Sequence, residues 1–315
     1  MRKIILAVLL VAFIAAVTVL AAKQNAIRVS ERDPGVEPML PEMVAIPEGS
    51  FLMGQEDGTE FERPVHEVFL SAFSIGRHEV TNAEYRRYCD ATGAPYPAPP
   101  LFDSSGRYFT GRPEHPVVEI SWSDATRYCL WLARRTGKPL RLPTEAEWEK
   151  AARGGLAQKK YPWGDDPPDE SRARFGLKAL EGPARVGSYP PNGYGLHDMG
   201  GNVNEMCSDW YDEHYYARSP RADPKGPPGW LNYLSLVNPP QRSRWKGRCR
   251  IVRGESYRAP ADWKTLGADG RLETPLLCAA REYLYQEPYT HFDLGFRVAG
   301  PAPEEHEGPG QPPGR

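Results

Sequence analysis

The chain has 315 residues, of which 40% are hydrophobic and 25% are charged, a composition typical of a globular protein with a sizeable core. Its 39 basic and 41 acidic side chains give a net charge of −2, which argues against nucleic acid as a partner. Thirty glycines and 33 prolines argue against long helices. The composition therefore predicts short elements joined by turn-rich connections.

The N-terminal segment has the pattern of a membrane-targeting helix. An uncharged apolar run covers Ile4–Ala22 and follows Arg2 and Lys3. As a helix this run would extend about 28 Å, close to the thickness of a hydrocarbon core, and the basic residues favour a cytoplasmic start. We expect residues 1–23 to be either a retained signal anchor or a cleaved signal peptide. A retained anchor would place the rest of the chain on the extracytoplasmic side of a cell membrane. A cleaved signal peptide would leave a periplasmic or secreted protein.

The rest of the chain divides into a single domain with polar ends. Residues 24–41 contain charged residues and proline without apolar periodicity, which is typical of a linker. Residues 301–315 are too polar and too rich in proline and glycine to fold, so a disordered tail is expected. Residues 42–300 show no internal repeat and no second composition boundary, which predicts one domain.

Short helices and strands are predicted within this domain from capping signals and apolar periodicity. The helices begin at Thr81 with Glu84, at Ser121 or Ser123, and at Thr144 with Glu147, and the first two end near Gly93 and Gly137. The strands are expected at Met43–Ile46, Ser50–Met53, His66–Leu70, Phe73–Gly76, Ile251–Arg253 and Gly295–Val298.

Five cysteines, an odd number, leave at least one thiol without a disulfide partner within the chain. They are Cys89, Cys129, Cys207, Cys249 and Cys278. None forms a CxxC pair, so neither a structural zinc site nor a thioredoxin-like centre is indicated. Cys89 and Cys129 fall on apolar helix faces, which predicts buried small hydrophobic side chains.

Several strings, in order, resemble one known family. They are MVAIPEGSFLMG, HEVTNAEYRRYCDATG, RLPTEAEWEKAARGG, YPPNGYGLHDMGGNVNEMCSDWY, VRGESY, CAAREY and DLGFRVAG. The chain resembles the sulfatase-modifying-factor family, also called formylglycine-generating-enzyme-like, over about 250 of its 315 residues. The resemblance implies an α+β fold of the C-type-lectin-like kind with little regular secondary structure. The family includes copper-dependent oxidases and also members without such chemistry.

The residues that match the oxidase site depart from the family pattern. The resemblance implies a copper held by two cysteines at C-x4-C spacing, and Cys278 matches the second of them. Glu273 stands in the first position, and a hard carboxylate is a poor ligand for Cu(I). Asn204 replaces a tryptophan next to the substrate groove, and Glu255 replaces a glycine. The sequence therefore favours a structural Cys278, buried or in a disulfide, and copper is not expected.

A calcium loop is also implied by the resemblance. Asp198 and Glu205 would supply carboxylates, and Gly201 and Val203 would supply backbone oxygens, a donor set that suits Ca²⁺. The alternative is that these acids only cap and pair locally. Arg174 stands where an asparagine ligand of a second family calcium site would be expected, so that site is not predicted.

Three functions remain open at this stage, in order of preference. The first is a membrane-anchored extracytoplasmic domain that binds or assembles protein partners in a complex without redox chemistry of its own. The second is a formylglycine-generating-type oxidase that acts on a protein cysteine through an altered Cys278 site. The third is a lectin-like ligand-binding module.

Overall fold

The computed structural model describes residues 35–178, 180–228, 249–259, 276–284 and 289–303. The apolar segment of residues 1–23, the linker up to residue 34 and the tail after residue 303 lie outside these described residues. Within the described ranges no helix combines the length and the apolar composition needed to cross a bilayer. Near the start of the described chain, Arg135 donates a hydrogen bond to the Val36 carbonyl at 3.2 Å.

The three predicted helices are confirmed, and each has the expected cap. They are α2 (Asn82–Thr92), α4 (Trp122–Thr136) and α5 (Glu145–Arg153). Their N-cap residues are Thr81, Ser121 and Thr144, and both hydrogen bonds of each capping box are present. Each helix ends at a glycine in the left-handed conformation, at Gly93, Gly137 and Gly154. A fourth helix, α3 (Tyr108–Gly111), is a single turn, and two 3₁₀ turns lie at η1 (Glu60–Glu62) and η2 (Tyr216–Arg218).

The strands of the described residues form three small sheets. The strands are β1 (Met43–Ile46), β2 (Gly49–Met53), β3 (His66–Leu70), β4 (Phe73–Gly76), β5 (Asn204–Trp210), β6 (Arg250–Arg253), β7 (Glu282–Leu284), β8 (Leu294–Gly295) and β9 (Ala299–Pro301). Their orders are β1-β4-β9, β2-β3 and β7-β6-β5-β8. All pairs are antiparallel except the parallel pair of β5 and β8.

The strand predicted at Gly295–Val298 is wrong. The chain pairs with β5 only through Leu294 and Gly295, and it pairs with β4 only from Ala299 onward. Between these, the carbonyls of Phe296 and Val298 accept hydrogen bonds from Val80 and Gly76. The segment therefore passes from one sheet to another and satisfies its backbone on the way without extending either strand.

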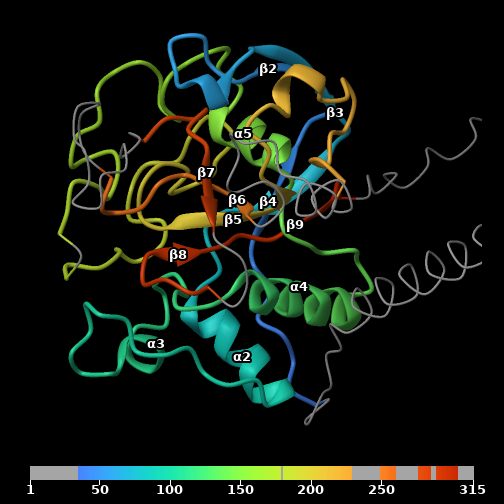
Figure 1. Cartoon of the computed structure of the whole chain (residues 1–315). Helices are drawn as coiled ribbons and strands as arrows, with labels where there is room; N and C mark the ends of the chain where they lie inside the picture. Colours follow the sequence, from blue (N-terminus) through green and yellow to red (C-terminus); the bar gives the residue numbers. More distant parts are fainter. Residues whose placement is uncertain (1–34, 179, 229–248, 260–275, 285–288, 304–315) are drawn as a thin grey trace, which may run out of the picture.

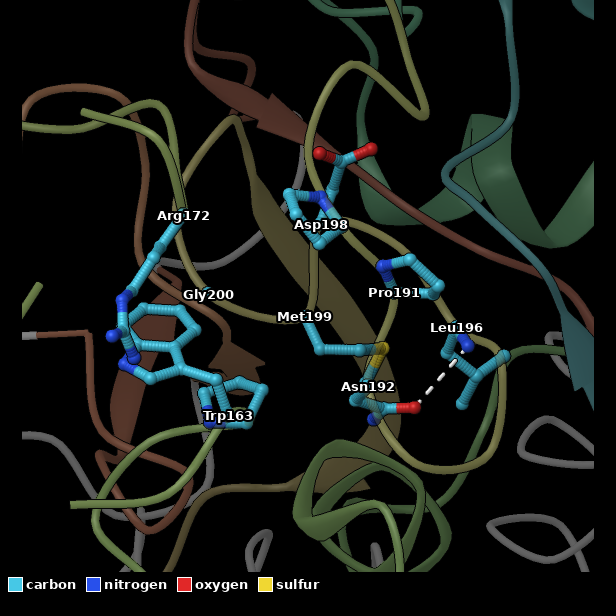
Figure 2. Close-up of a pocket in the computed structure, with 10 residues that line it drawn as sticks. Trp163, Arg172, Pro191, Asn192, Leu196, Asp198, Met199 and Gly200 are labelled. Carbon is cyan, nitrogen blue, oxygen red and sulfur yellow. Dashed lines mark hydrogen bonds between the residues drawn. The ribbon is translucent and has the colours of Figure 1, made fainter. Parts of the chain in front are cut away.

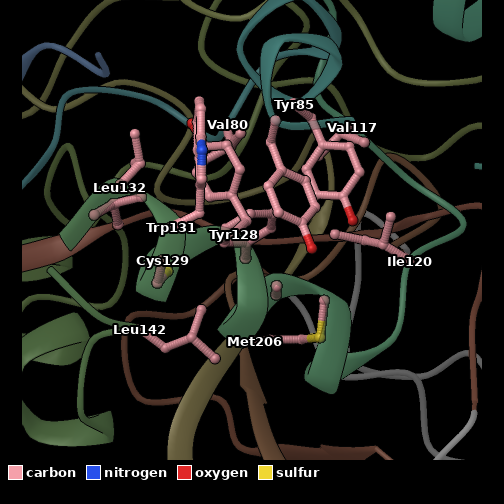
Figure 3. Close-up of a cluster of buried hydrophobic side chains, with 14 of the residues drawn as sticks. Val80, Tyr85, Val117, Ile120, Tyr128, Cys129, Trp131, Leu132, Leu142 and Met206 are labelled. Atoms are coloured by element: carbon pink, nitrogen blue, oxygen red, sulfur yellow. The ribbon is translucent and has the colours of Figure 1, made fainter. Parts of the chain in front are cut away.

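The elements form layers, and strands β5 and β6 of the four-stranded sheet lie in the middle one (Figure 1). Helices α2 and α4 lie on one side, and α5 with β2 and β3 lies on the other. The first side contains an aromatic cluster (Figure 3), in which Tyr85 stacks on Tyr128 with ring centroids 5.6 Å apart and Tyr128 meets Phe296 edge-on at 5.4 Å. Such ring pairs stabilise a core that has few long elements to pack.

The C-terminal end of α5 is fixed by the loop that contains Asn192 and Gly193. The Asn192 amide donates to the carbonyls of Ala151 and Ala152 at 2.8 and 3.2 Å, which satisfies the last turn of the helix. The backbones of Gly154 and Gly193 approach so closely that a Cβ on Gly193 would lie 2.3 Å from the Gly154 carbonyl oxygen. Only glycine permits this contact.

We predict that Gly193→Ala lowers the free energy of unfolding by about 2 kcal/mol or more, because the new methyl group must displace backbone rather than a flexible side chain. Urea denaturation followed by circular dichroism would measure the change. Gly111→Ala is the control, since a Cβ there meets its nearest neighbour, the Arg107 side chain, at 3.5 Å. Equal stability of the two variants would contradict the packing described here.

Candidate functional site

A buried ion network joins α5 to β6 in the centre of the molecule. Glu145 and Glu149 are one helical turn apart and therefore lie on the same face of α5. Arg253, on β6, donates to Glu149 at 2.6 Å and to Glu145 at 3.3 Å. Its side chain and that of Glu149 are fully buried. Charges buried to this extent are tolerated only when they are paired, so the two elements are fixed against each other.

Two further arginines complete the network. Arg281 holds Glu145 in a bidentate pair at 2.6 and 3.1 Å, and Arg153 donates to Glu149 at 2.7 Å. Burial alone would raise the pKa of Glu149, but Arg153 and Arg253 outweigh it and hold that pKa below its usual value. Glu149 is thus a charged partner of the guanidinium groups and not an acid–base group poised near neutral pH.

Cys278 lies directly beside this network. Its side chain is fully buried, and it forms no disulfide. Its N–H donates to the Lys160 carbonyl at 2.8 Å, and its own carbonyl accepts from Arg253 at 2.8 Å. Burial raises the pKa of the thiol to about 12. Of the two structural states expected for Cys278, buried or disulfide-bonded, the structure has the buried thiol. A reactive cysteine needs the opposite environment, with exposure and a lowered pKa.

Three other residues depart from the oxidase pattern, and two of them lie in the described part of the chain. Glu273 lies outside the described residues. Asn204 is the first residue of β5, and its side-chain oxygen is buried without a hydrogen-bond partner within the described part of the chain. Glu255 is buried and takes a positive φ of 58°, in the region that glycine adopts most readily. The glycine that the family carries at this position thus suits the backbone better than the glutamate does.

A pocket of about 50 Å³ lies next to the segment that carries Cys278 (Figure 2). Trp163 and Arg172 form one side of it, and Asn192 and Leu196 form the other. Its wall also includes Gly200, where a methyl group would meet the Leu276 carbonyl at 3.4 Å. A water molecule needs about 10–15 Å³ of such volume, so the pocket has room for a few water molecules.

The predicted calcium loop is folded, and its two acids are already engaged. Glu205 accepts two hydrogen bonds of 2.6 Å from Arg297 and one of 2.8 Å from the Trp148 indole. Asp198 accepts from the Gly187 N–H at 2.7 Å. Both carboxylates therefore make local hydrogen bonds in the structure.

A third acid, Glu79, was missed from the sequence. It is fully buried, one of its oxygens accepts from the Asn202 amide at 2.9 Å, and the other has no partner within the described residues. Burial raises its pKa well above the usual value, and the charges of Asp198 and Glu205 add to this. The only signal for Glu79 in the sequence was its position in the family string HEVTN.

Glu79, Asp198 and Glu205 lie in one buried cluster. Burial and the charges of Asp198 and Glu205 raise the pKa of Glu79, and the Arg297 guanidinium acts against them. However, no three His, Cys, Asp or Glu side chains among the described residues converge as metal ligands do. A calcium ion would thus depend on backbone oxygens such as those predicted at Gly201 and Val203, and the unsatisfied oxygen of Glu79 fits such a site.

Comparison with known proteins places the chain in a family. Residues 29–301 match the sulfatase-modifying factor enzyme 1-like domain. The chain belongs to this family. It is 37% identical to the formylglycine-generating enzyme of Thermomonospora curvata over 241 residues, which cover 59% of this chain and 78% of the relative. The corresponding enzyme of Streptomyces coelicolor is 36% identical over 267 residues, with 68% of this chain and 78% of the relative covered.

A solved structure agrees with this assignment. PvdO from Pseudomonas aeruginosa superimposes with a TM-score of 0.64 at 27% sequence identity, and the match covers 87% of this chain and 98% of that one. The sulfatase-modifying-factor fold expected from the sequence, a mixed α and β fold with few helices, is therefore confirmed. Membership of the family does not by itself decide the chemistry, which depends on the residues at the site.

The ion network generates a stability prediction. We expect Arg253→Met to lower the free energy of unfolding by about 3–5 kcal/mol, because it leaves Glu149 buried with one partner fewer. Arg185→Met is the matched control, since Arg185 forms a salt bridge with Glu114 at the surface, and it should change stability by less than about 1 kcal/mol. Chemical denaturation of both variants would measure these values. Similar small effects in both would show that the buried network does not hold the fold.

Proposed function

We propose that this chain is a binding or assembly domain of the sulfatase-modifying-factor family without redox chemistry of its own. The observation that carries the proposal is the state of Cys278, a fully buried thiol whose pKa burial raises to about 12. Glu273 in place of the first copper-ligand cysteine supports it from the sequence. Without a pair of soft thiolates, Cu(I) has no suitable site at this position.

The location of the domain is part of the same proposal. The apolar segment of residues 1–23 supports attachment to a cell membrane, with the domain on the extracytoplasmic side, or export if the segment is removed. A domain held there without chemistry of its own would act through protein partners in a membrane-associated complex. The formal net charge of −2 gives no support for nucleic acid among those partners.

The alternative is a formylglycine-generating-type oxidase that uses an altered site built on Cys278. It is favoured by the two relatives named as formylglycine-generating enzymes, at 37% and 36% identity. For this alternative to hold, the buried Cys278 thiol would have to become exposed to a substrate peptide.

The two functions are separated by copper binding and by peptide oxidation. We expect the full chain, titrated with Cu(I) under reducing conditions, to show no stoichiometric binding that depends on Cys278. We also expect no conversion of the cysteine in a sulfatase-type peptide to formylglycine, as measured by mass spectrometry. The Thermomonospora curvata enzyme is the positive control for this assay. The control is Cys129→Ser, which removes another fully buried thiol. Copper binding that is lost in Cys278→Ser but kept in Cys129→Ser would overturn the proposal.

We further propose a structural Ca²⁺ held by Asp198 and Glu205 with the backbone oxygens of Gly201 and Val203. The Glu79 oxygen that has no partner within the described residues supports a cation at this cluster. Its chemistry would be structural, since a bound ion joins the loop before β5 to the strand itself and stabilises the folded state by mass action.

Calcium at about 100 times its dissociation constant should raise the melting temperature by about 5 °C, and a chelator should reverse the change. Asp198→Ala should abolish this response. The matched control is Asp165→Ala, because Asp165 is an exposed acid paired only locally with Lys159 and the Lys160 N–H. No calcium response in the parent chain, or an equal response in both variants, would contradict the site.

A further inference from the structure

A second cavity lies at the N-terminal end of α5, away from Cys278. Its volume is about 390 Å³, within the range of small-molecule sites. Thr144, the N-cap of α5, and Glu147 line it. Cys278 is not among the residues that line this cavity. The cavity is therefore separate from the family's cysteine site.

Chain segments that are distant in sequence build this cavity, and its floor is apolar. Leu70 and Phe73, on either side of the turn between β3 and β4, are almost fully buried and contribute to the lining. Pro224 and Pro301 add further apolar surface. A ligand with a short hydrocarbon side chain could pack against this apolar surface.

Four charged side chains line the cavity, and three of them have partners in the structure. Arg141 and Glu147 form a bidentate pair with two hydrogen bonds of 2.7 Å. Asp223 accepts from the N–H and the hydroxyl of Ser71, both at 2.8 Å. Lys225 has no ion pair or hydrogen bond to any described residue, although it lies two positions from Asp223. Its ammonium group is the available cation of the cavity.

The loop that presents Asp223 and Lys225 is attached to β3. The Phe69 N–H donates to the Arg221 carbonyl at 2.7 Å, and the Asp223 N–H donates back to the Phe69 carbonyl at 2.9 Å. These bonds extend the sheet edge, so Asp223 is held in place before any ligand arrives. Pre-positioned groups bind more tightly because less conformational entropy is lost on binding.

We propose that this cavity binds a small zwitterion of the amino-acid or dipeptide class, with its carboxylate at Lys225 and its ammonium at Asp223. The lining carries two cations and two anions, so a ligand of net charge zero with separated charges complements it. Among the described residues Asp223 accepts hydrogen bonds from the neutral Ser71 alone, and a carboxylate retains further acceptor positions for an ammonium group. The inference rests on the proposed binding function and names the ligand class of one site.

Isothermal titration of the full chain with alanyl-leucine would test this proposal, because the dipeptide carries both charges and an apolar side chain. We expect saturable binding with one site. The N-acetyl derivative and the C-terminal amide should each bind about tenfold more weakly, since each loses one charge-assisted contact. Tight binding of either derivative, or no saturable binding of the dipeptide, would overturn the proposal.

Substitutions assign the binding to this cavity. Lys225→Gln and Asp223→Asn should each weaken binding of the dipeptide about fivefold to tenfold, and asparagine tolerates the positive φ of 44° at position 223. Lys178→Gln removes the same charge from an exposed lysine outside the cavity and should change nothing. Equal binding by the parent chain and Lys225→Gln would refute the assignment. Cys278→Ser should leave this binding intact, so failure here is distinguishable from failure of the copper test.

Discussion

The pairing of Arg253 with two glutamates of α5 is the interaction on which the centre of the molecule depends. Glu149 also accepts the Gly54 N–H at 2.8 Å, and Arg253 also donates to the carbonyls of Cys278 and Ala279. One charged cluster therefore fixes helix α5, the ends of strands β2 and β6, and the segment that carries Cys278. Because any displacement would leave a buried charge without a partner, the cluster disfavours other packings of the same short elements.

Those features of the fold that depend on neighbouring residues could be predicted from the sequence. Each capping box joins two residues only three positions apart, so Thr81 with Glu84 and Thr144 with Glu147 were sufficient to locate two helices. Strand β5 was missed because it buries acids, and a buried Glu205 breaks the apolar pattern by which strands are recognised. Its charge is compensated by Arg297, which lies 92 positions later in the chain and which no local pattern reveals.

The site was predictable to the same limited extent. Glu273 in the first ligand position and Asn204 in place of a tryptophan favoured a structural Cys278, but the hydrogen bond from Arg253 to its carbonyl is a tertiary contact. Glu79 is 123 positions from Asn202, whose side-chain amide donates a hydrogen bond to it. Its place beside the predicted calcium loop therefore follows only from the folded chain. Likewise, the cavity that contains Lys225 is assembled from segments whose proximity is set by sheet pairing.

Because all five cysteines are buried as free thiols, the chain has to fold before these thiols are oxidised. In the unfolded chain each thiol would have an ordinary pKa near 8.5 and would be open to exchange, whereas in the folded protein burial protects it. If the domain is exported, it therefore has to fold before an oxidising compartment joins these thiols in non-native pairs, a process that takes seconds to hours. Slow-folding variants should be lost as misoxidised chains, so a reducing environment during refolding would protect them.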